Sequence, residues 1–121
     1  MRIAISGTHF SGKSTLISSL VKRLPSYISV DEPYFLLEEE GFLFSDPPSL
    51  EDFEQQFKRS IMLVEESGVN TIFDRSPIDF LVYALVLSEK LSLGGEIGLE
   101  YWVQEMEEAI QMLDLIFFSS D

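Results

Sequence analysis

The sequence contains no cysteine, which excludes disulfide bonds and thiolate metal sites. Long hydrophobic runs are also missing, because no stretch approaches the roughly 20 apolar residues that a membrane helix needs. The N-terminal apolar run, 3–5, is too short for the core of a signal peptide. These absences favour a cytoplasmic protein that makes no contact with a membrane.

Basic residues are scarce. Lys and Arg total 8 against 21 acidic residues, the net charge is −13, and neither Lys nor Arg occurs after Lys90. A surface of this charge repels nucleic acid, so we expect no nucleic-acid partner. A small nucleotide bound with Mg²⁺ escapes this objection, because a few local cations and backbone amides can outweigh the mean field.

What the sequence does contain is an alternation of strand-like and helix-like segments. The 121 residues, 45% of them hydrophobic, predict one small domain over 1–121. Short apolar runs predict strands, and apolar residues at helical spacing predict helices. The predicted strands are 3–5, 27–30, 71–73 and 115–118, and the predicted helices are 13–24, 35–40, 50–67, 78–87 and 99–112. This alternation predicts a three-layer α/β/α fold with a parallel sheet covered on both faces.

The segment 7–14 matches the phosphate-loop pattern G-x-x-x-x-G-K-[ST] at every fixed position, between a predicted strand and a predicted helix. Gly7 and Gly12 permit a backbone that turns N–H groups onto phosphate oxygens, and the helix N-terminus adds its positive dipole. Lys13 is expected to reach the β- and γ-phosphates, and the Ser14 hydroxyl to ligate Mg²⁺. The residues predicted to hold the nucleotide are Gly7, Thr8, His9, Phe10, Ser11, Gly12, Lys13, Ser14 and Thr15.

Charged residues follow the second and third predicted strands, as Asp31-Glu32-Pro33 and Asp74-Arg75-Ser76-Pro77. Ligands bind at the carboxyl ends of parallel strands, so these groups should converge with the phosphate loop. Asp74 is predicted to organise Mg²⁺ through a water, with a helix N-cap as the alternative. Arg75 is predicted to hold a transferring or accepting phosphate, the alternative being a salt bridge to neighbouring acids. Glu32 is predicted to orient an acceptor hydroxyl or take its proton, with an ordinary surface acid as the alternative.

These motifs together resemble the P-loop nucleoside and nucleotide kinases. The elements of the resemblance are Gly-Thr-His-x-x-Gly-Lys-Ser-Thr, Asp-Glu-Pro and Asp-Arg-Ser-Pro-Ile-Asp. More narrowly, the chain is similar over nearly its whole length to small AAA-type ATP-binding domains allied to ribosylnicotinamide kinase. The resemblance implies ATP as phosphate donor, strand order 2-3-1-4, and Lys13, Glu32 and Arg75 as catalytic residues. It also implies that Gln55 or Gln56 reads an acceptor base.

The same resemblance fails beyond the fourth strand. Kinases of this kind continue into an arginine-bearing lid and a fifth strand, and this sequence reaches Asp121 with neither. We therefore expect a second copy or a partner chain to cover the fourth strand's edge. Three alternatives stay open: a fragment of a longer kinase, a short kinase, and a binding-only relative.

The function expected from the sequence is transfer of the ATP γ-phosphate to a small acceptor, a nucleoside or a nucleotide. A non-catalytic ATP-binding module and a nucleotide-dependent ATPase or switch are the alternatives. Tyr34 and Phe35, just after Glu32, are candidates for stacking on an acceptor base. Asp79 is expected to complement the dipole of its helix. The phenylalanines expected in the core are Phe53, Phe57, Phe73, Phe80, Phe117 and Phe118.

Overall fold

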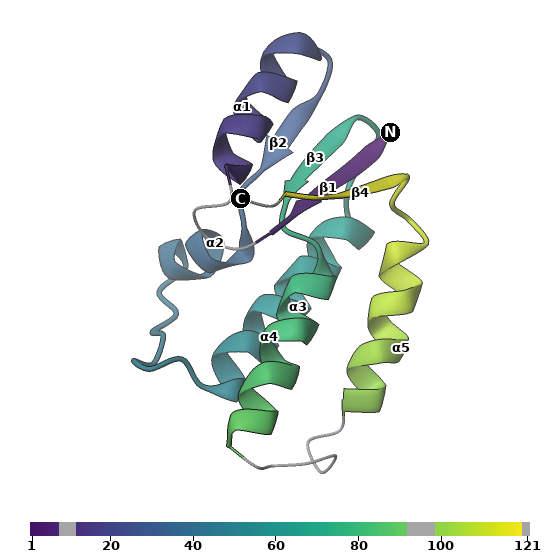
Figure 1. Cartoon of the computed structure of the whole chain (residues 1–121). Coiled ribbons are helices and arrows are strands. Elements are labelled where there is room, and N and C mark those ends of the chain that lie inside the picture. Colours follow the sequence, from purple (N-terminus) through teal and green to yellow (C-terminus); the bar gives the residue numbers. More distant parts are fainter. Residues whose placement is uncertain (8–11, 92–98, 120–121) are drawn as a thin grey trace.

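Figure 1 shows the computed structural model of the chain, which describes residues 1–7, 12–91 and 99–119. Within these residues, strands and helices alternate as the sequence predicts. The elements are β1 (Arg2–Ser6), α1 (Lys13–Arg23), β2 (Ile28–Val30), α2 (Pro33–Glu39), α3 (Leu50–Glu65), β3 (Thr71–Asp74), α4 (Pro77–Lys90), α5 (Leu99–Ile110) and β4 (Leu115–Phe118). Every element expected from the sequence is present, with bounds that differ by a few residues.

The four strands form one parallel sheet in the order β2-β3-β1-β4. In the central strand, Ile3 is paired with Ile72 of β3 on one side and with Leu115 of β4 on the other. This order confirms the prediction of 2-3-1-4. Because all strands run in one direction, the carboxyl ends of β1, β2 and β3 lie at one edge of the sheet.

Helices lie on both faces of the sheet. Side chains along β1 alternate between the faces, so each face presents apolar residues that a helix can bury. Ile3, Ile5 and Ile72 are buried against the apolar side of α1. Ala4 and Phe73 point the other way, into a larger core formed with α3, α4 and α5. Figure 1 shows α1 on one side of the sheet and these three helices on the other. The arrangement is compatible with a three-layer α/β/α fold.

The starts of α3 and α4 are fixed by serine caps. Ser49 Oγ accepts the Asp52 backbone N–H at 3.2 Å, and Asp52 Oδ2 accepts the Ser49 N–H at 2.8 Å, which together form a capping box. Ser49 is therefore the N-cap of the helix predicted over 50–67. The N-cap of α4 is Ser76, whose Oγ accepts the Ile78 N–H at 3.2 Å. Asp74 is therefore free of the capping role that was its alternative.

Two of the phenylalanines predicted for the core lie at the surface instead. Phe117 is 48% exposed and Phe118 is 61% exposed, whereas Phe57, Phe73 and Phe80 are buried. Phe117 is paired with Ile5, so it faces the side of the sheet that carries α1. That helix packs on β1, β2 and β3. Hydrophobicity predicted the strand correctly, but it did not show that β4 lies outside the area that α1 covers.

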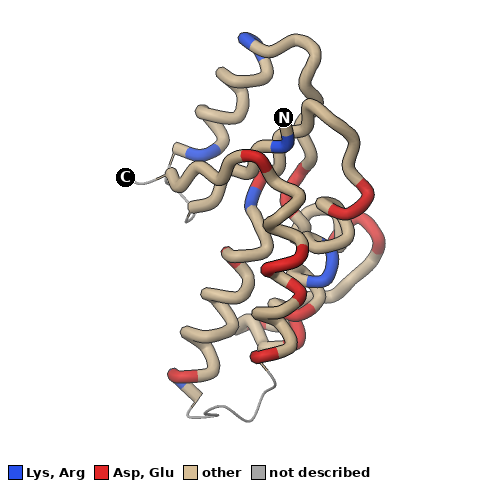
Figure 2. Tube along the Cα trace, turned by 90° about the vertical axis from the view of Figure 1, so that its right-hand side faces the viewer, with Lys and Arg blue, Asp and Glu red and all other residues tan. Residues whose placement is uncertain are grey.

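Charge is distributed unevenly over the two sides. Helix α1 contains lysine and arginine and no acidic residue. Figure 2 shows acidic residues spread along the opposite helices and the connecting loops.

None of the helices that the structure describes is long and apolar enough to cross a membrane.

The aromatic pair between α3 and α5 supplies a test of the fold. The rings of Phe57 and Trp102 stack with centroids 4.7 Å apart, and Phe57 is 1% exposed. We expect Phe57→Ala to lower the free energy of unfolding by about 3–5 kcal/mol, because it removes a buried ring and leaves a cavity. Leu43→Ala, at a side chain that is 90% exposed, should change it by less than about 0.5 kcal/mol. Urea unfolding followed by circular dichroism measures both, and equal effects would contradict this account of the core.

Candidate functional site

The predicted phosphate loop is described only at its two ends. Gly12 has φ 80° and ψ 8° and is the N-cap of α1, a left-handed conformation that favours glycine. Ser14 and Thr15 lie in the first turn of α1 and are exposed. The other predicted nucleotide-binding residues, Thr8, His9, Phe10 and Ser11, lie outside the described residues. Their role stays a prediction.

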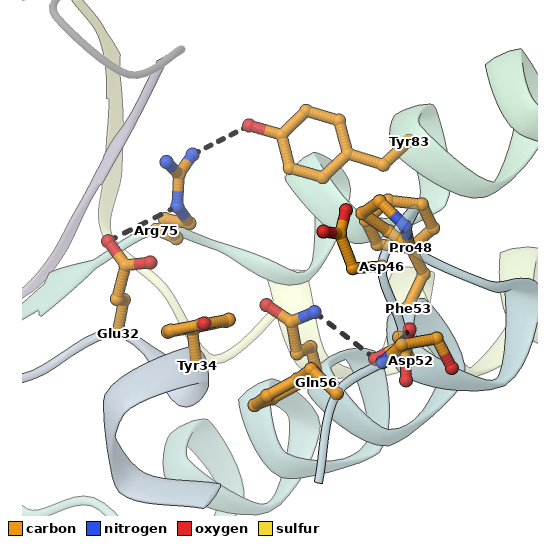
Figure 3. Close-up of a pocket in the computed structure, with 11 residues that line it drawn as sticks. Glu32, Tyr34, Asp46, Pro48, Asp52, Phe53, Gln56, Arg75 and Tyr83 are labelled. Atoms are coloured by element: carbon orange, nitrogen blue, oxygen red, sulfur yellow. Dashed lines mark hydrogen bonds and ion pairs between the residues drawn. The ribbon is translucent and has the colours of Figure 1, made fainter. Parts of the chain in front are cut away.

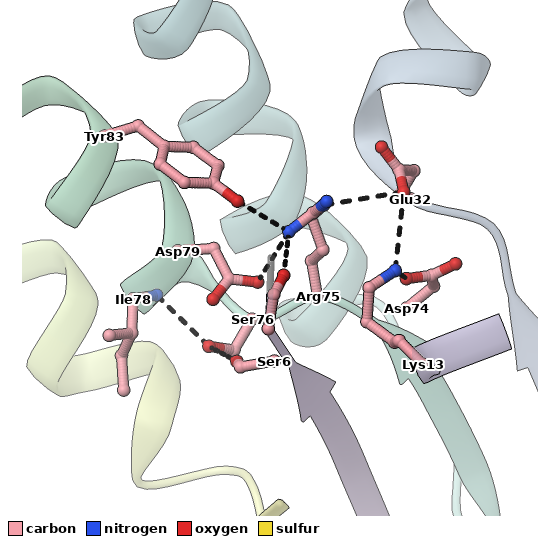
Figure 4. Close-up of polar contacts among 10 residues, drawn as sticks. Ser6, Lys13, Glu32, Asp74, Arg75, Ser76, Ile78, Asp79 and Tyr83 are labelled. Atoms are coloured by element: carbon pink, nitrogen blue, oxygen red, sulfur yellow. Dashed lines mark hydrogen bonds and ion pairs between the residues drawn. The ribbon is translucent and has the colours of Figure 1, made fainter. Parts of the chain in front are cut away.

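Lys13, the first residue of α1, is buried at the carboxyl edge of the sheet, and its side chain is 7% exposed. Its ammonium group is ion-paired with Asp74, the last residue of β3. It also lies 3.6 Å from Oε2 of Glu32, which precedes α2 just after β2. Figure 4 shows these three side chains pointing toward one another. The predicted convergence of the strand ends is therefore present in the structure.

Arg75 joins the same group from the other side. Its Nε lies 3.4 Å from Oε2 of Glu32, and Nη1 donates to Tyr83 Oη at 2.8 Å. Nη1 also donates to the backbone carbonyl of Gly7, at the start of the predicted phosphate loop. The residue is 2% exposed. The salt bridge that was the alternative for Arg75 is thus present, and it belongs to a network that reaches the loop.

The backbone of Arg75 is unusual, with φ 82° in a region that non-glycine residues seldom occupy. Its N–H donates to the Ile5 carbonyl at 2.8 Å, which holds the chain against β1 as it leaves β3. Burial disfavours the charged guanidinium, but the surrounding charges, Glu32 first, outweigh it and raise the pKa of Arg75 above its usual value. The guanidinium is therefore permanently charged and firmly held.

Asp79, in the first turn of α4, is a third acid of this group and, like Glu32, is buried, with 8% of its surface exposed. Its Oδ2 accepts no hydrogen bond within the described residues, and Arg75 Nη1 lies 3.6 Å from it. Burial raises the pKa of Asp79 to about 6, although the Arg75 charge opposes the shift. Burial also raises the pKa of the Tyr83 phenol. We call Lys13, Glu32, Asp74, Arg75 and Asp79 the charge cluster; it contains two cations and three acids.

A pocket of about 450 Å³ opens beside the charge cluster (Figure 3). Glu32 and Arg75 belong both to the cluster and to the pocket wall. The remaining lining residues are Tyr34, Phe44, Ser45, Asp46, Pro48, Asp52, Phe53, Gln56 and Tyr83. Helices α2, α3 and α4 and the segment between α2 and α3 thus surround a space at the carboxyl edge of the sheet. Its size suits a ligand as large as a nucleoside.

The structure separates the candidates for acceptor recognition. Gln56 lines the pocket and is buried, whereas Gln55 is not among the lining residues. Tyr34 lines the pocket too and stacks on Phe44 with ring centroids 4.3 Å apart. Phe35 is 50% exposed and does not contribute to the wall. The pocket wall therefore contains one residue from each predicted pair, Gln56 and Tyr34.

Tyr83 and Asp46 are among the lining residues that the sequence did not identify, and the reasons differ. Tyr83 follows Asp79 by four residues on α4, so both lie on one face of the helix and meet Arg75. That spacing could have identified it once the helix was predicted. Asp46 lies in the irregular segment between α2 and α3, and no periodicity or motif marks it.

In comparisons with known proteins, no protein-family model and no curated protein sequence matches this chain. The chemistry of the site therefore follows from its own geometry. A buried lysine at a helix N-terminus, acids at the ends of adjacent strands and a neighbouring pocket can hold an anion next to a second, hydroxyl-bearing molecule.

The raised pKa of Asp79 makes the stability of the fold depend on pH. The folded chain retains this proton up to about pH 6, while an unfolded chain releases it near 3.8, so the contribution of Asp79 becomes less favourable as pH rises through that window. We therefore compare the free energy of unfolding of the Asp79→Asn variant with that of the original chain. This difference should shift in favour of the variant by about 2–3 kcal/mol as the pH rises from 4 to 8. Urea titrations at several pH values measure this difference. Glu39→Gln, at an exposed acid, is the matched control, and a difference for Asp79→Asn that does not change with pH would contradict the assignment.

Proposed function

We propose that this protein is a P-loop phosphotransferase that binds ATP with Mg²⁺ and transfers the γ-phosphate to a hydroxyl group of a small acceptor. One observation carries the proposal: the charge cluster joins the start of α1 to the ends of β2 and β3, directly beside a pocket of nucleoside size. It agrees with the resemblance to P-loop nucleoside and nucleotide kinases.

The nucleotide would bind at the N-terminus of α1. Gly12 provides the left-handed turn, and Lys13 the buried positive charge, next to the helix dipole. Magnesium that accompanies a nucleotide takes one or two carboxylates, with phosphate oxygens and waters completing its shell. Asp74, whose side chain is 20% exposed, and the exposed Ser14 suit that arrangement and would hold the ion. When bound, the ion would offset phosphate charge during transfer.

The charges of the cluster agree with a nucleotide that arrives with its cation. Glu32, Asp74 and Asp79 outnumber Lys13 and Arg75, so a bare triphosphate would face a net negative site. A bound divalent cation reverses this balance. In the described residues, no three His, Cys, Asp or Glu side chains group as a metal site of their own. The donors that we assign to the ion are therefore shared with the phosphates.

The acceptor would occupy the pocket, with Glu32 at the boundary between the two ligands. Its carboxylate contacts Lys13 on the nucleotide side and also lines the pocket. In the proposed reaction the acceptor oxygen forms a bond to the γ-phosphorus, and the bond from that phosphorus to the bridging oxygen of ADP breaks. Glu32 takes the proton that the acceptor hydroxyl releases. The products are ADP and the phosphorylated acceptor.

Arg75 would place a fixed positive charge between the two ligands. It reaches the carbonyl of Gly7 on the nucleotide side and Tyr83 on the pocket side. Because it is held from several directions, little reorganisation is needed when negative charge builds up during transfer. We assign to it electrostatic stabilisation rather than proton transfer, since its pKa is raised.

The first test concerns the nucleotide. Lys13→Met removes the only lysine at the start of α1, and we expect affinity for ATP–Mg²⁺ to fall roughly 10- to 100-fold, the usual effect of losing hydrogen bonds to a charged group. Calorimetric titration measures this affinity. Lys22→Met, at the exposed far end of the same helix, is the control, and circular dichroism verifies that both variants fold. An affinity that is equal in all three chains would contradict the nucleotide site.

The second test concerns transfer. We expect Glu32→Gln to lower the rate of acceptor phosphorylation by roughly 10²- to 10⁴-fold, because the amide cannot take the proton. ATP affinity should fall much less. Product analysis with labelled ATP and a panel of nucleosides and nucleotides measures transfer, with Asp31→Asn, at the exposed neighbouring acid, as control. Release of free phosphate with no labelled acceptor would favour the ATPase alternative, and binding without turnover would favour a non-catalytic module.

A further inference from the structure

The polar wall of the pocket consists mainly of groups that accept hydrogen bonds. Three carboxylates line it, those of Glu32, Asp46 and Asp52, together with the amide of Gln56. Arg75 is the only cation among the described lining residues. A ligand that matches such a wall brings hydrogen-bond donors, such as hydroxyl or amino groups, rather than anionic oxygens.

The charge of Arg75 does not make the pocket positive. Glu32 lies 3.4 Å from its Nε and Asp79 lies 3.6 Å from its Nη1, so two acids are already in close contact with the guanidinium. The acids Asp46 and Asp52 then leave the pocket with excess negative charge. A second phosphate group placed in it would meet like charges at short range, an arrangement that costs affinity.

Gln56 contributes an acceptor whose orientation is fixed. The residue is 7% exposed, and its Nε2 donates to the Asp52 carbonyl at 3.1 Å. Figure 3 shows that the amide nitrogen points to Asp52 and the amide oxygen the other way, into the pocket. Within the described residues no hydrogen bond to that oxygen is present, so it is an acceptor that a ligand in the pocket can use.

Asp46 differs from the other acids in the wall. The Asp52 carboxylate accepts the N–H groups of Ser45 and Ser49, at 3.0 and 2.8 Å, and so closes the loop and caps α3. No hydrogen bond or ion pair holds Asp46 among the residues that the structure describes. Figure 3 shows its side chain turned toward the pocket, on the side of Tyr83 and Gln56. Its charge is therefore available to a ligand.

The apolar parts of the wall are flat. The stacked rings of Tyr34 and Phe44 lie on one side, and Phe53 and Tyr83, with centroids 5.6 Å apart, lie on another. Aromatic walls of this kind bind planar groups, and their faces also attract cations. Aromatic rings combined with free carboxylates thus favour a planar ligand that is neutral or positively charged.

We infer that the acceptor is a planar, hydroxyl-bearing compound without phosphate or carboxylate groups, of the nucleoside type and neutral or cationic, and that Asp46 is the specificity-determining residue that excludes anionic acceptors. This inference rests on the proposed function and decides between its two acceptor classes. Glu32 and Asp52 also repel anionic acceptors, but Glu32 belongs to the charge cluster and Asp52 caps α3. The charge of Asp46 can be changed without disturbing the cluster or the cap.

The test is a set of calorimetric titrations with five ribonucleosides, their 5′-monophosphates and the cation N1-methyladenosine. Adenosine, N1-methyladenosine and adenosine monophosphate form the matched series of charge. At least one nucleoside should bind at least about 10-fold more tightly than its monophosphate, because like charges oppose the latter. Asp46→Asn should lower the ratio of nucleoside affinity to monophosphate affinity at least about threefold. Asp46→Lys should lower this ratio further or reverse the preference. Glu39→Gln, at an exposed acid that does not line the pocket, should leave the ratio unchanged.

Monophosphates that bind as tightly as their nucleosides would overturn the inference. So would a ratio of nucleoside affinity to monophosphate affinity that neither Asp46 substitution changes. Failure of every nucleoside to bind a chain that does bind ATP would overturn the acceptor class alone. ATP–Mg²⁺ titrated into the same samples reports separately on the proposed function, which fails if ATP does not bind.

Discussion

The carboxylate of Glu32 joins the parts of the site into one unit. Its Oε2 lies 3.6 Å from the ammonium of Lys13 and 3.4 Å from the guanidinium of Arg75, and all three side chains are buried. Ions taken out of water are stable only when partners of opposite charge surround them, so removing one member of this group leaves the charges that remain less well compensated. The contact also joins segments that follow three different strands, and it fixes α2 and the beginning of α1 relative to β3. Two of these residues, Glu32 and Arg75, also line the neighbouring pocket.

The same contact creates a competition that a ligand must resolve. Lys13 is already paired with Asp74 and Glu32, and phosphate oxygens would have to take it from them. A group that brings positive charge to Asp74 makes this exchange favourable, since the carboxylate then keeps a partner. In the proposed function, binding of a phosphate is therefore linked to binding of a cation. Arg75 is held differently: its contacts to Gly7 and Tyr83 are not made with acids, so it can keep its position while the pairing of Lys13 changes.

Sequence patterns predicted the sheet and the convergence of the charge cluster, and physical reasons explain why they did not predict the rest. Alternation along β1 placed Ile3 and Ile5 on one face, and parallel strands necessarily bring Glu32 and Asp74 to one edge. The exposure of Phe117 depended on how far α1 extends over the sheet, which no local pattern contains. The position of Asp46 likewise depends on an irregular segment, which the hydrogen bond from Ser45 N–H to the Asp52 carboxylate joins to α3. The roles assigned to residues 8–11 and to the catalytic side chains stay predictions.

The distribution of unfavourable features over the molecule supports a functional interpretation of the cluster. Over much of the rest of the fold, local and global preferences agree: Ser49 caps α3, and apolar residues of β1 and β3 fill the cores on both faces of the sheet. At the ends of β1, β2 and β3 the preferences conflict. Arg75 adopts a left-handed backbone, Asp79 is buried with a raised pKa, and Lys13 is buried with acids on two sides. Apolar side chains of similar volume would often be no less stable than buried ion pairs. Conflicts of this kind concentrate where a protein needs chemistry rather than stability, and here they concentrate where the charge cluster meets the pocket.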